Sequence, residues 1–186
     1  LHSLQTKSGF SKSERSMSSL FATSAKTASV DRIVYLGGLI PPGNTSELSE
    51  HLRSRAEVGE ILRGSGVPTA ELRAAVILGS GSASFEMLRY LTERLPAMIT
   101  PKWVYNRIQP IAIRDVLRYL VGCADLPPHV NRKFDIGGPN VLTYSKMMQR
   151  YAAIAGLRKR LIVPVPALTP NLSSPSVGVI TPVPSN

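Results

Sequence analysis

The sequence predicts an α/β protein with a doubly wound parallel sheet, and three observations support this prediction. Short apolar runs alternate along the chain with segments whose apolar residues recur at helical spacing. Two of the runs end at glycine pairs, Gly37–Gly38 and Gly137–Gly138, as expected of buried parallel strands. The chain has 186 residues, of which 43% are hydrophobic, so a core of ordinary size is available. Strands that alternate with helices through short loops are typical of a parallel sheet covered by helices.

The first 30 residues allow two interpretations. Serine is abundant there and basic residues outnumber the single acid, Glu14, a composition that resembles a targeting segment. However, Met17, Leu20, Phe21 and Ala25 recur at helical spacing. That spacing favours a surface helix whose apolar face packs on a sheet.

The middle of the chain predicts strands and helices in alternation. Strands are expected over residues 32–36, 69–78, 108–113 and 133–136. Helices are expected over residues 49–63, 85–95, 115–123 and 143–155. Ser49, Asp115 and Thr143 stand where a side chain can cap the first turn of a helix.

The end of the chain differs in composition from the middle. Residues 161–186 contain no charged side chain and six prolines, so residues 161–166 can form an edge strand but not a central one. We therefore divide the chain into an N-terminal segment (1–30), a central α/β domain (31–165) and a proline-rich tail (166–186).

Composition excludes several classes of protein. No apolar run approaches the roughly 18–20 residues that span a bilayer. The single cysteine, Cys123, excludes a disulfide framework within the chain and a cysteine-based zinc site, and the three histidines are too scattered for a metal motif. These observations predict a soluble, cytoplasmic globular protein without a metal site.

The net charge of +10 does not by itself indicate nucleic-acid binding. Basic residues are spread along the chain, and the only tight run is Arg158-Lys159-Arg160. The charge therefore favours a solvated basic surface, or a basic cleft for an anionic cofactor, over a nucleic-acid partner.

A glycine-rich segment, Gly79-Ser-Gly81-Ser-Ala-Ser84, lies between a predicted strand and a predicted helix. It approaches the G-x-G-x-x-G phosphate loop of dinucleotide sites, but a serine stands at the third glycine position. No acidic residue follows about 20 residues later at the end of another strand, where it would meet a ribose hydroxyl. A glycine-rich turn that borders a cleft is the favoured interpretation.

His51 and Arg55 are four residues apart near the start of a predicted helix, so they share one face of it. A neutral histidine can exchange protons near pH 7, and an arginine can pair with a phosphate. The alternative is an exposed polar face among ordinary charges. The spacing alone leaves both interpretations open.

Five segments in order resemble the NAD(P)-binding short-chain dehydrogenase/reductase superfamily: Val30–Leu39, His51–Gly59, Leu72–Gly79, Gln109–Val116 and Phe134–Pro139. The resemblance covers roughly residues 14–182. It is greatest to the atypical, NmrA-like and YbjT-like group of nucleoside-diphosphate-sugar epimerase relatives. It implies a partial Rossmann-like sheet, a small C-terminal α/β part on the substrate side, and NAD(P) as cofactor.

The same resemblance shows departures from the family's catalytic pattern. The family's glycine-rich pyrophosphate loop belongs to a first strand–helix unit that this sequence does not contain. The family's Tyr-x-x-x-Lys pair falls on His51 and Arg55, and its catalytic serine or threonine falls near Gly37–Gly38. Without the first strands, one apolar sheet edge is expected to be uncovered and available for self-association.

Ligands of open α/β sheets bind beyond the carboxyl ends of the strands, so we expect one cleft there. The expected catalytic residues are His51 and Arg55. The expected cofactor-binding residues are Gly37, Gly38, Ala74, Ala75 and Val76. The expected substrate-side residues are Ser82, Trp103 and Gln109.

Three functions are consistent with these residues. The first is an NAD(P)-binding oxidoreductase or epimerase-like protein with weak or no ordinary dehydrogenase chemistry, acting on an unknown small molecule. The second is a non-catalytic, dinucleotide-sensing or structural protein of the NmrA-like kind. The third is a truncated remnant without function. Because tyrosine, lysine and hydroxyl are all replaced, the resemblance implies cofactor binding more firmly than catalysis.

Overall fold

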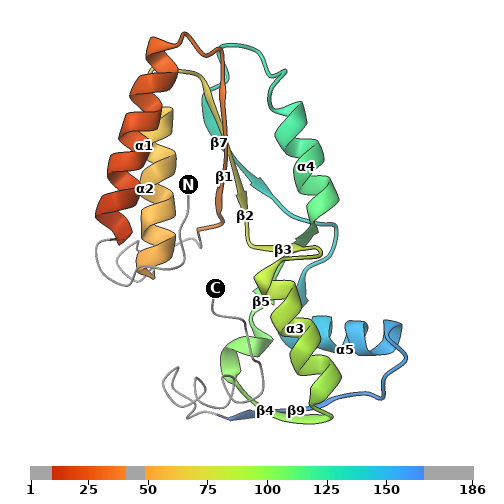
Figure 1. Cartoon of the computed structure of the whole chain (residues 1–186). Helices are drawn as coiled ribbons and strands as arrows, with labels where there is room; N and C mark the ends of the chain where they lie inside the picture. Colours follow the sequence, from red (N-terminus) through yellow and green to blue (C-terminus); the bar gives the residue numbers. More distant parts are fainter. Residues whose placement is uncertain (1–9, 41–48, 166–186) are drawn as a thin grey trace. The chain divides into compact units, whose positions relative to one another are not determined.

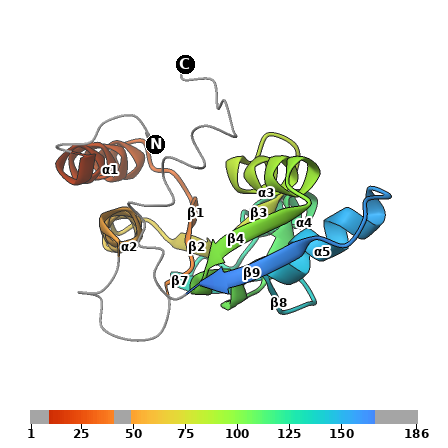
Figure 2. The same ribbon diagram turned by 90° about the horizontal axis from the view of Figure 1, so that it is seen from below.

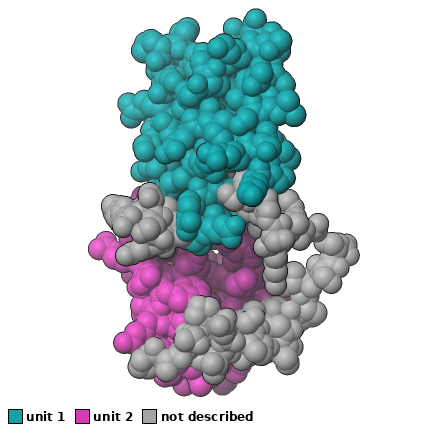
Figure 3. Space-filling view, turned by 90° about the vertical axis from the view of Figure 1, so that its left-hand side faces the viewer, with its two compact units in different colours: residues 1–75, 113–137 teal, residues 76–112, 138–186 magenta. Residues whose placement is uncertain are grey.

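The computed structural model describes residues 10–40 and 49–165, and the chain forms two compact units (Figure 1, Figure 3). Unit 1 comprises residues 1–75 and 113–137, and unit 2 comprises residues 76–112 and 138–186. Each unit is therefore built from two separate stretches of the chain. The segment 166–186, predicted to be a proline-rich tail, lies outside the described residues. Among the described helices, none is long and apolar enough to cross a membrane.

The sheet of unit 1 has three parallel strands in the order β1-β2-β7. These are β1 (Ile33–Gly38), β2 (Thr69–Ala74) and β7 (Arg132–Ile136). The parallel pairing of β1 with β2 confirms the predicted arrangement. The register aligns Arg73 with Asp135, and the Arg73 Nε donates to the carboxylate at 2.6 Å.

Helices cover both faces of this sheet, which confirms the doubly wound prediction (Figure 1). On one face, α1 (Phe10–Thr27) and α2 (Glu50–Arg63) pack against Ile33 and Tyr35. On the other face, α4 (Ile113–Gly122) packs against the neighbouring side chains Val34 and Leu36. Alternate residues of β1 thus enter two different cores, as the two-residue period of a strand requires.

The N-terminal segment is a helix, but its buried face differs from the predicted one. Ala22 and Ala25 are buried, together with the polar residues Glu14 and Ser18. Met17, Leu20 and Phe21, expected to pack on the sheet, are 38%, 69% and 43% exposed. The prediction was wrong because it assumed an apolar buried face, whereas the Glu14 carboxylate accepts a hydrogen bond from the Ser54 hydroxyl on α2.

The described residues of unit 2 form three small two-stranded sheets and two main helices. Parallel pairs are formed by β3 (Val76–Leu78) with β6 (Pro110–Ala112) and by β4 (Ala97–Pro101) with β9 (Leu161–Val165). The antiparallel pair is β5 (Arg107–Ile108) with β8 (Leu142–Thr143). The helices are α3 (Ala83–Arg94) and α5 (Tyr144–Ile154), with a 3-10 turn, η2 (Lys102–Tyr105). Figure 2 shows β4 and β9 side by side.

Two predicted strands are each divided in the structure. The strand expected over 69–78 breaks at Ala75 into β2, which joins the sheet of unit 1, and β3, which pairs with β6 in unit 2. The strand expected over 108–113 breaks at Gln109 into β5 and β6. In both cases one predicted strand contributes to two different sheets.

Ser49 and Thr143 cap their helices as predicted, because their hydroxyls accept from the N–H groups of Leu52 and Lys146. Asp115 does not. It lies inside the first turn of α4, which begins at Ile113 immediately after β6. Its carboxylate there complements the positive end of the helix dipole instead of capping it.

Candidate functional site at the end of strand β1

The candidate site of unit 1 lies where β1 ends and α2 packs over it. Gly37 and Gly38 are the last residues of β1, and both are buried. A Cβ added to Gly38 would lie 3.1 Å from Leu52 Cδ2 and 3.6 Å from Arg55 Cδ. The absence of a side chain at Gly38 therefore lets Arg55 of α2 reach the end of the strand. This part of the predicted site is brought together by the fold.

Arg55 is half-buried, and its Nε has no hydrogen-bond partner among the residues that the structure describes. Such a donor, shielded from water and unbound, carries a desolvation cost of about 1–3 kcal/mol. An oxyanion or a hydroxyl oxygen at this position would satisfy it, and a guanidinium suits phosphate oxygens especially well. Arg55 is thus a candidate ligand-binding residue on geometric grounds.

His51 lies in the first turn of α2, one turn before Arg55, and is half-buried. The two residues share a helix face by their spacing. The catalytic role predicted for His51 stays a prediction.

A buried polar layer lies beneath Arg55, between α2 and the sheet. The Tyr35 hydroxyl donates to the backbone carbonyl of Arg55 at 3.4 Å, and Arg63 Nε donates to the carboxylate of Glu71 at 2.9 Å. Burial raises the pKa of Tyr35, the nearby Arg55 lowers it, and the carboxylates of Glu71 and Glu14 raise it further. The net effect keeps the phenol protonated, so Tyr35 is a donor that holds α2 in place.

Sequence reasoning missed this polar layer. Glu14, Ser54 and Glu71 are only 3%, 2% and 3% exposed, although their residue types are mostly found at surfaces. Their spacing carries no signal, because the partners come from elements far apart in the sequence: Ser54 meets Glu14 of α1 across 40 residues.

Two further predicted cofactor residues lie at the end of β2. Ala74 is buried, and its carbonyl accepts from the N–H of Leu39 at 2.9 Å. Ala75 is exposed and separates β2 from β3.

The remaining predicted residues belong to unit 2. Val76 opens β3 and is buried. Ser82 precedes α3, and its hydroxyl donates to the Ile77 carbonyl at 2.8 Å. The turn before it is tight, because Gly81 adopts φ +79 and Ser82 N donates to the Gly79 carbonyl at 3.1 Å. The segment is thus a glycine-rich turn between strand and helix, as expected.

Trp103 and Gln109 differ in whether their side chains are exposed or hydrogen-bonded within the protein. Trp103, in η2, is 52% exposed and packs edge-on against Tyr144, with ring centroids 5.4 Å apart. Gln109 donates its amide to the Gly138 carbonyl at 2.6 Å, so this side chain is engaged within the protein. The substrate roles predicted for Ser82, Trp103 and Gln109 stay predictions.

Comparison with solved structures finds a similar fold in several proteins of low sequence identity to this chain. The enzyme WbmH of Bordetella bronchiseptica, solved in complex with NAD+, matches with a TM-score of 0.67 and 16% identity, over 93% of this chain and 65% of that one. UDP-N-acetylglucosamine 4-epimerase from Bacillus cereus matches with a TM-score of 0.68 and 13% identity, over 96% and 69%. The human epimerase family protein SDR39U1, solved with NADPH, matches with a TM-score of 0.66 and 19% identity, over 83% and 57%.

These likenesses confirm the predicted fold, a partial Rossmann-like α/β architecture. This chain spans 65% of the length of WbmH and 57% of that of SDR39U1. No protein-family model matches the sequence, and no curated protein matches it either.

Proposed function

We propose that the chain forms part of an NAD(P) site in an oxidoreductase or epimerase-like protein that has weak or no ordinary dehydrogenase chemistry. The observation that carries the proposal is Arg55, whose buried Nε lacks a described partner beside Gly38 at the carboxyl end of β1. The fold shared with proteins solved with NAD+ and NADPH supports it. The position of Arg55 also supports the proposal, because open α/β sheets bind ligands beyond the carboxyl ends of their strands.

In this proposal the guanidinium of Arg55 donates to ribose or phosphate oxygens of the dinucleotide. Gly37, Gly38, Ala74 and Ala75 of unit 1 form the backbone wall against which it binds. Val76, which belongs to unit 2, stays a cofactor-binding residue predicted from the sequence alone. A bound nicotinamide would supply hydride transfer, and His51 would supply a proton. Ser82, Trp103 and Gln109 are proposed to face a small-molecule substrate.

Backbone-amide shifts in an NADH or NADPH titration followed by nuclear magnetic resonance test this proposal. We expect shifts at Gly38 and Arg55, with a dissociation constant no tighter than about millimolar. Binding is weak because the family's pyrophosphate loop has no counterpart in the sequence, and several charge-assisted hydrogen bonds of about 1.5–3 kcal/mol each are absent.

Two matched variants on α2 complete the test. Arg55→Met removes the guanidinium and is expected to weaken binding at least about tenfold, the loss of one charge-assisted hydrogen bond. Arg53→Met, an exposed arginine of the same helix, is the control and should bind as the parent does. A low-micromolar dissociation constant would move the phosphate site to the Gly79–Ser84 turn. Equal losses in both variants would refute the role of Arg55.

A second candidate is a non-catalytic, dinucleotide-sensing protein of the NmrA-like kind. It is favoured by Gly37 and Gly38, which offer no hydroxyl at the end of β1 where the related enzymes carry a serine or threonine. A sensor would distinguish NADH from NAD+ in affinity without consuming either. Loss of NADH absorbance in the presence of a panel of carbonyl compounds, abolished in His51→Asn, would instead establish catalysis.

The buried, unbridged Cys123 fits a reducing compartment, and we place the protein in the cytoplasm.

We also propose that copies of the chain associate through the open edge of β1. Among the described strands, β1 pairs with β2 alone. The N–H groups of Ile33 and Leu39 donate toward β2, so the backbone groups of Val34, Leu36 and Gly38 face the other side. An uncharged strand with such an edge is a template for pairing with another chain.

A groove beside this edge supports the same proposal. It has a volume of about 350 Å³ and lies between α1 and the start of β1. Phe21, Ala25, Ala28 and Val30 supply much of its apolar lining. A second copy paired at the edge would cover this apolar surface.

A further inference from the structure

The positive charge of the chain is concentrated in unit 2. That unit contains nine lysines and arginines but only two acidic residues, Glu86 and Glu93. Both glutamates lie on α3 and are already engaged: Glu86 pairs with Arg89 at 2.8 Å, and Glu93 accepts from the Tyr151 hydroxyl at 2.5 Å. Among the described residues of unit 2, no cation outside α3 is paired with a carboxylate of the unit.

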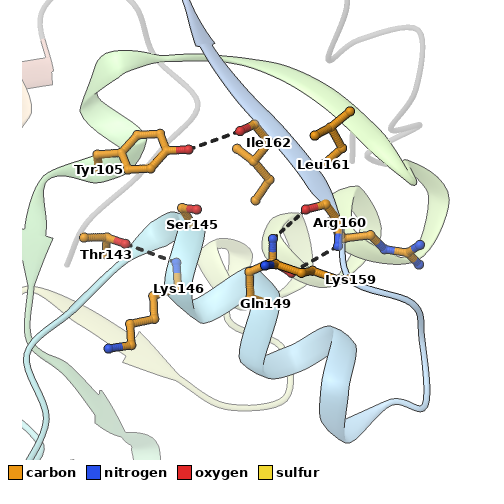
Figure 4. A pocket seen from close by; sticks show the side chains of 9 residues that line it. All are labelled: Tyr105, Thr143, Ser145, Lys146, Gln149, Lys159, Arg160, Leu161 and Ile162. Atoms are coloured by element: carbon orange, nitrogen blue, oxygen red, sulfur yellow. Dashed lines mark hydrogen bonds between the residues drawn. The ribbon is translucent and has the colours of Figure 1, made fainter.

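Three of these cations line one pocket, which lies between η2, α5 and the start of β9 (Figure 4). Its volume is about 410 Å³. The lining consists of Tyr105, Thr143, Ser145, Lys146, Gln149, Lys159, Arg160, Leu161 and Ile162, and it includes no acid. In Figure 4, Ser145 lies between Tyr105 and Gln149, Lys146 is on the left, and Lys159 and Arg160 are on the right.

Hydrogen bonds fix the walls of this pocket to one another. The side-chain amide of Gln149, on α5, forms two hydrogen bonds with the backbone of Arg160. It donates to the Arg160 carbonyl at 2.6 Å and accepts from the Arg160 N–H at 3.0 Å. The Tyr105 hydroxyl donates to the Ile162 carbonyl at 3.2 Å. Leu161 N donates to the Pro96 carbonyl at 2.9 Å. These bonds hold the start of β9 against α5 and η2.

Lys146 occupies a helix position that disfavours a cation. Thr143 is the N-cap of α5 and accepts from Lys146 N at 3.1 Å, which makes Lys146 the third residue of the helix. A glutamate at this position would complete a capping box with Thr143, and its charge would suit the helix dipole. The first turn of α5 contains no acidic residue. A local rule broken in this way is expected at functional sites.

Arg160 adds a second unfavourable feature to the same pocket. It is only 8% exposed, and its Nε has no hydrogen-bond partner among the described residues. A buried guanidinium nitrogen without a partner costs free energy, just as a cation at a helix N-terminus does. Arg160 and Lys146 both line the pocket, and their side chains extend toward opposite sides of it in Figure 4.

We propose that this pocket binds the phosphate group of a small phosphorylated molecule. The N–H and hydroxyl groups of Ser145 at the start of α5 donate to the phosphate oxygens, and Lys146 and Lys159 neutralise its charge. Tyr105 and Leu161 present an apolar surface to the organic part of the molecule. The site lies wholly within unit 2 and is independent of the dinucleotide proposal for unit 1.

Calorimetric titration of the full chain with inorganic phosphate and with phenyl phosphate tests the proposal. We expect saturable binding of both, with phenyl phosphate tighter. Tighter binding of inorganic phosphate would show that the ligand has no organic part, and absence of saturable binding of either would overturn the site.

Lys146→Glu separates a ligand-binding role from a structural one. The variant is expected to lose at least about tenfold in affinity, which corresponds to about 1.4 kcal/mol. Without phosphate it should melt at a higher temperature than the parent, because the glutamate completes the capping box. A lower melting temperature would show that Lys146 is structural and would overturn the argument.

Lys102→Glu is the matched control, because it makes the same charge change in unit 2 at a residue outside the pocket lining. It should change the affinity less than about twofold. Equal losses in the two variants would show that phosphate responds only to the overall charge of the unit. If Lys146→Glu does not fold, Lys159→Gln is expected to weaken binding about threefold, and an unchanged affinity would refute the site.

Discussion

The carboxylate of Glu71 fills the space that Gly59 leaves beside α2: a Cβ added to Gly59 would lie 2.6 Å from both carboxylate oxygens. Glu71 lies in β2 and is held there by Arg63, whose Nε is 2.9 Å from the carboxylate. Glycine at position 59 therefore allows α2 to pack closely on the buried carboxylate of the Arg63–Glu71 ion pair.

Gly59→Ala is expected to destabilise the protein by about 2 kcal/mol, because a methyl group must displace a buried carboxylate that Arg63 holds. Urea denaturation measures the loss. The double variant Gly59→Ala/Glu71→Ala should lose less than the two single losses combined, since the clash disappears with the carboxylate. Gly122→Ala is the control: its Cβ would meet nothing within 4 Å, so stability should not fall. A neutral Gly59→Ala would contradict the packing argument.

Tyr35 is expected to make stability fall at alkaline pH. Burial raises the pKa of its phenol in the folded protein, so above about pH 10 the unfolded chain releases a proton that the native protein retains. The contribution of Tyr35 to the free energy of unfolding is therefore complete below about pH 10. It is lost as the pH rises toward the pKa of Tyr35 in the folded protein. In Tyr35→Phe the decline of the urea midpoint between about pH 9 and 11 should be shallower than in the parent. Tyr119→Phe, an exposed ring of α4, is the control.

Gln149→Ala is expected to loosen β9 from α5. The substitution removes both hydrogen bonds to the Arg160 backbone, for a combined loss of about 2 kcal/mol. Faster hydrogen exchange of the Arg160 amide and a lower melting temperature are the measurements. Arg150→Ala, an exposed neighbour on α5, should leave both unchanged. An Arg160 amide that exchanges at the parent rate would show that other contacts hold the strand.

Phe21→Lys is expected to weaken self-association if a second copy covers the groove beside β1. Phe21 lines that groove and is 43% exposed, so the substitution places a charge in the apolar interface with little effect on folding. Sedimentation velocity over a range of concentrations measures the change. Ile154→Lys makes a similar change at an 87% exposed residue outside the groove lining and should associate as the parent does. Association that is equally strong in both variants would refute this interface.

The strands and helices of the fold were predictable where local chemistry is decisive. Ser49 and Thr143 cap their helices as expected, and the apolar run before Gly37 forms a parallel strand. The break at Ala75 was not predictable, because residues on both sides are apolar and only their partners, β1 and β6, assign them to different sheets. β4 was not predicted, because it follows Pro96 directly and ends at a second proline, Pro101.

The candidate site was predictable in part. The spacing of His51 and Arg55 indicated a shared face, and the structure brings Arg55 to Gly38. Gln109 was expected to face a substrate, and its engagement with Gly138 depends on a partner 29 residues away. The basic pocket of unit 2 was not foreseen, since Tyr105, Lys146 and Arg160 come from three separate segments of the chain whose association only the fold reveals.

Because each unit is built from two stretches of chain, the strands and helices of one unit are synthesised at different times. β7 joins β2 through residues such as Asp135, 62 positions after its partner Arg73. Synthesis runs from the N-terminus, so β1 and β2 leave the ribosome long before the strand and the helix α4 that complete their sheet. A two-stranded sheet is at best marginally stable alone. A nascent chain paused before residue 113, where α4 begins, therefore lacks both the helix and the strand that pack on Leu36 and Leu72 of unit 1, and chaperones that bind apolar segments would engage that face.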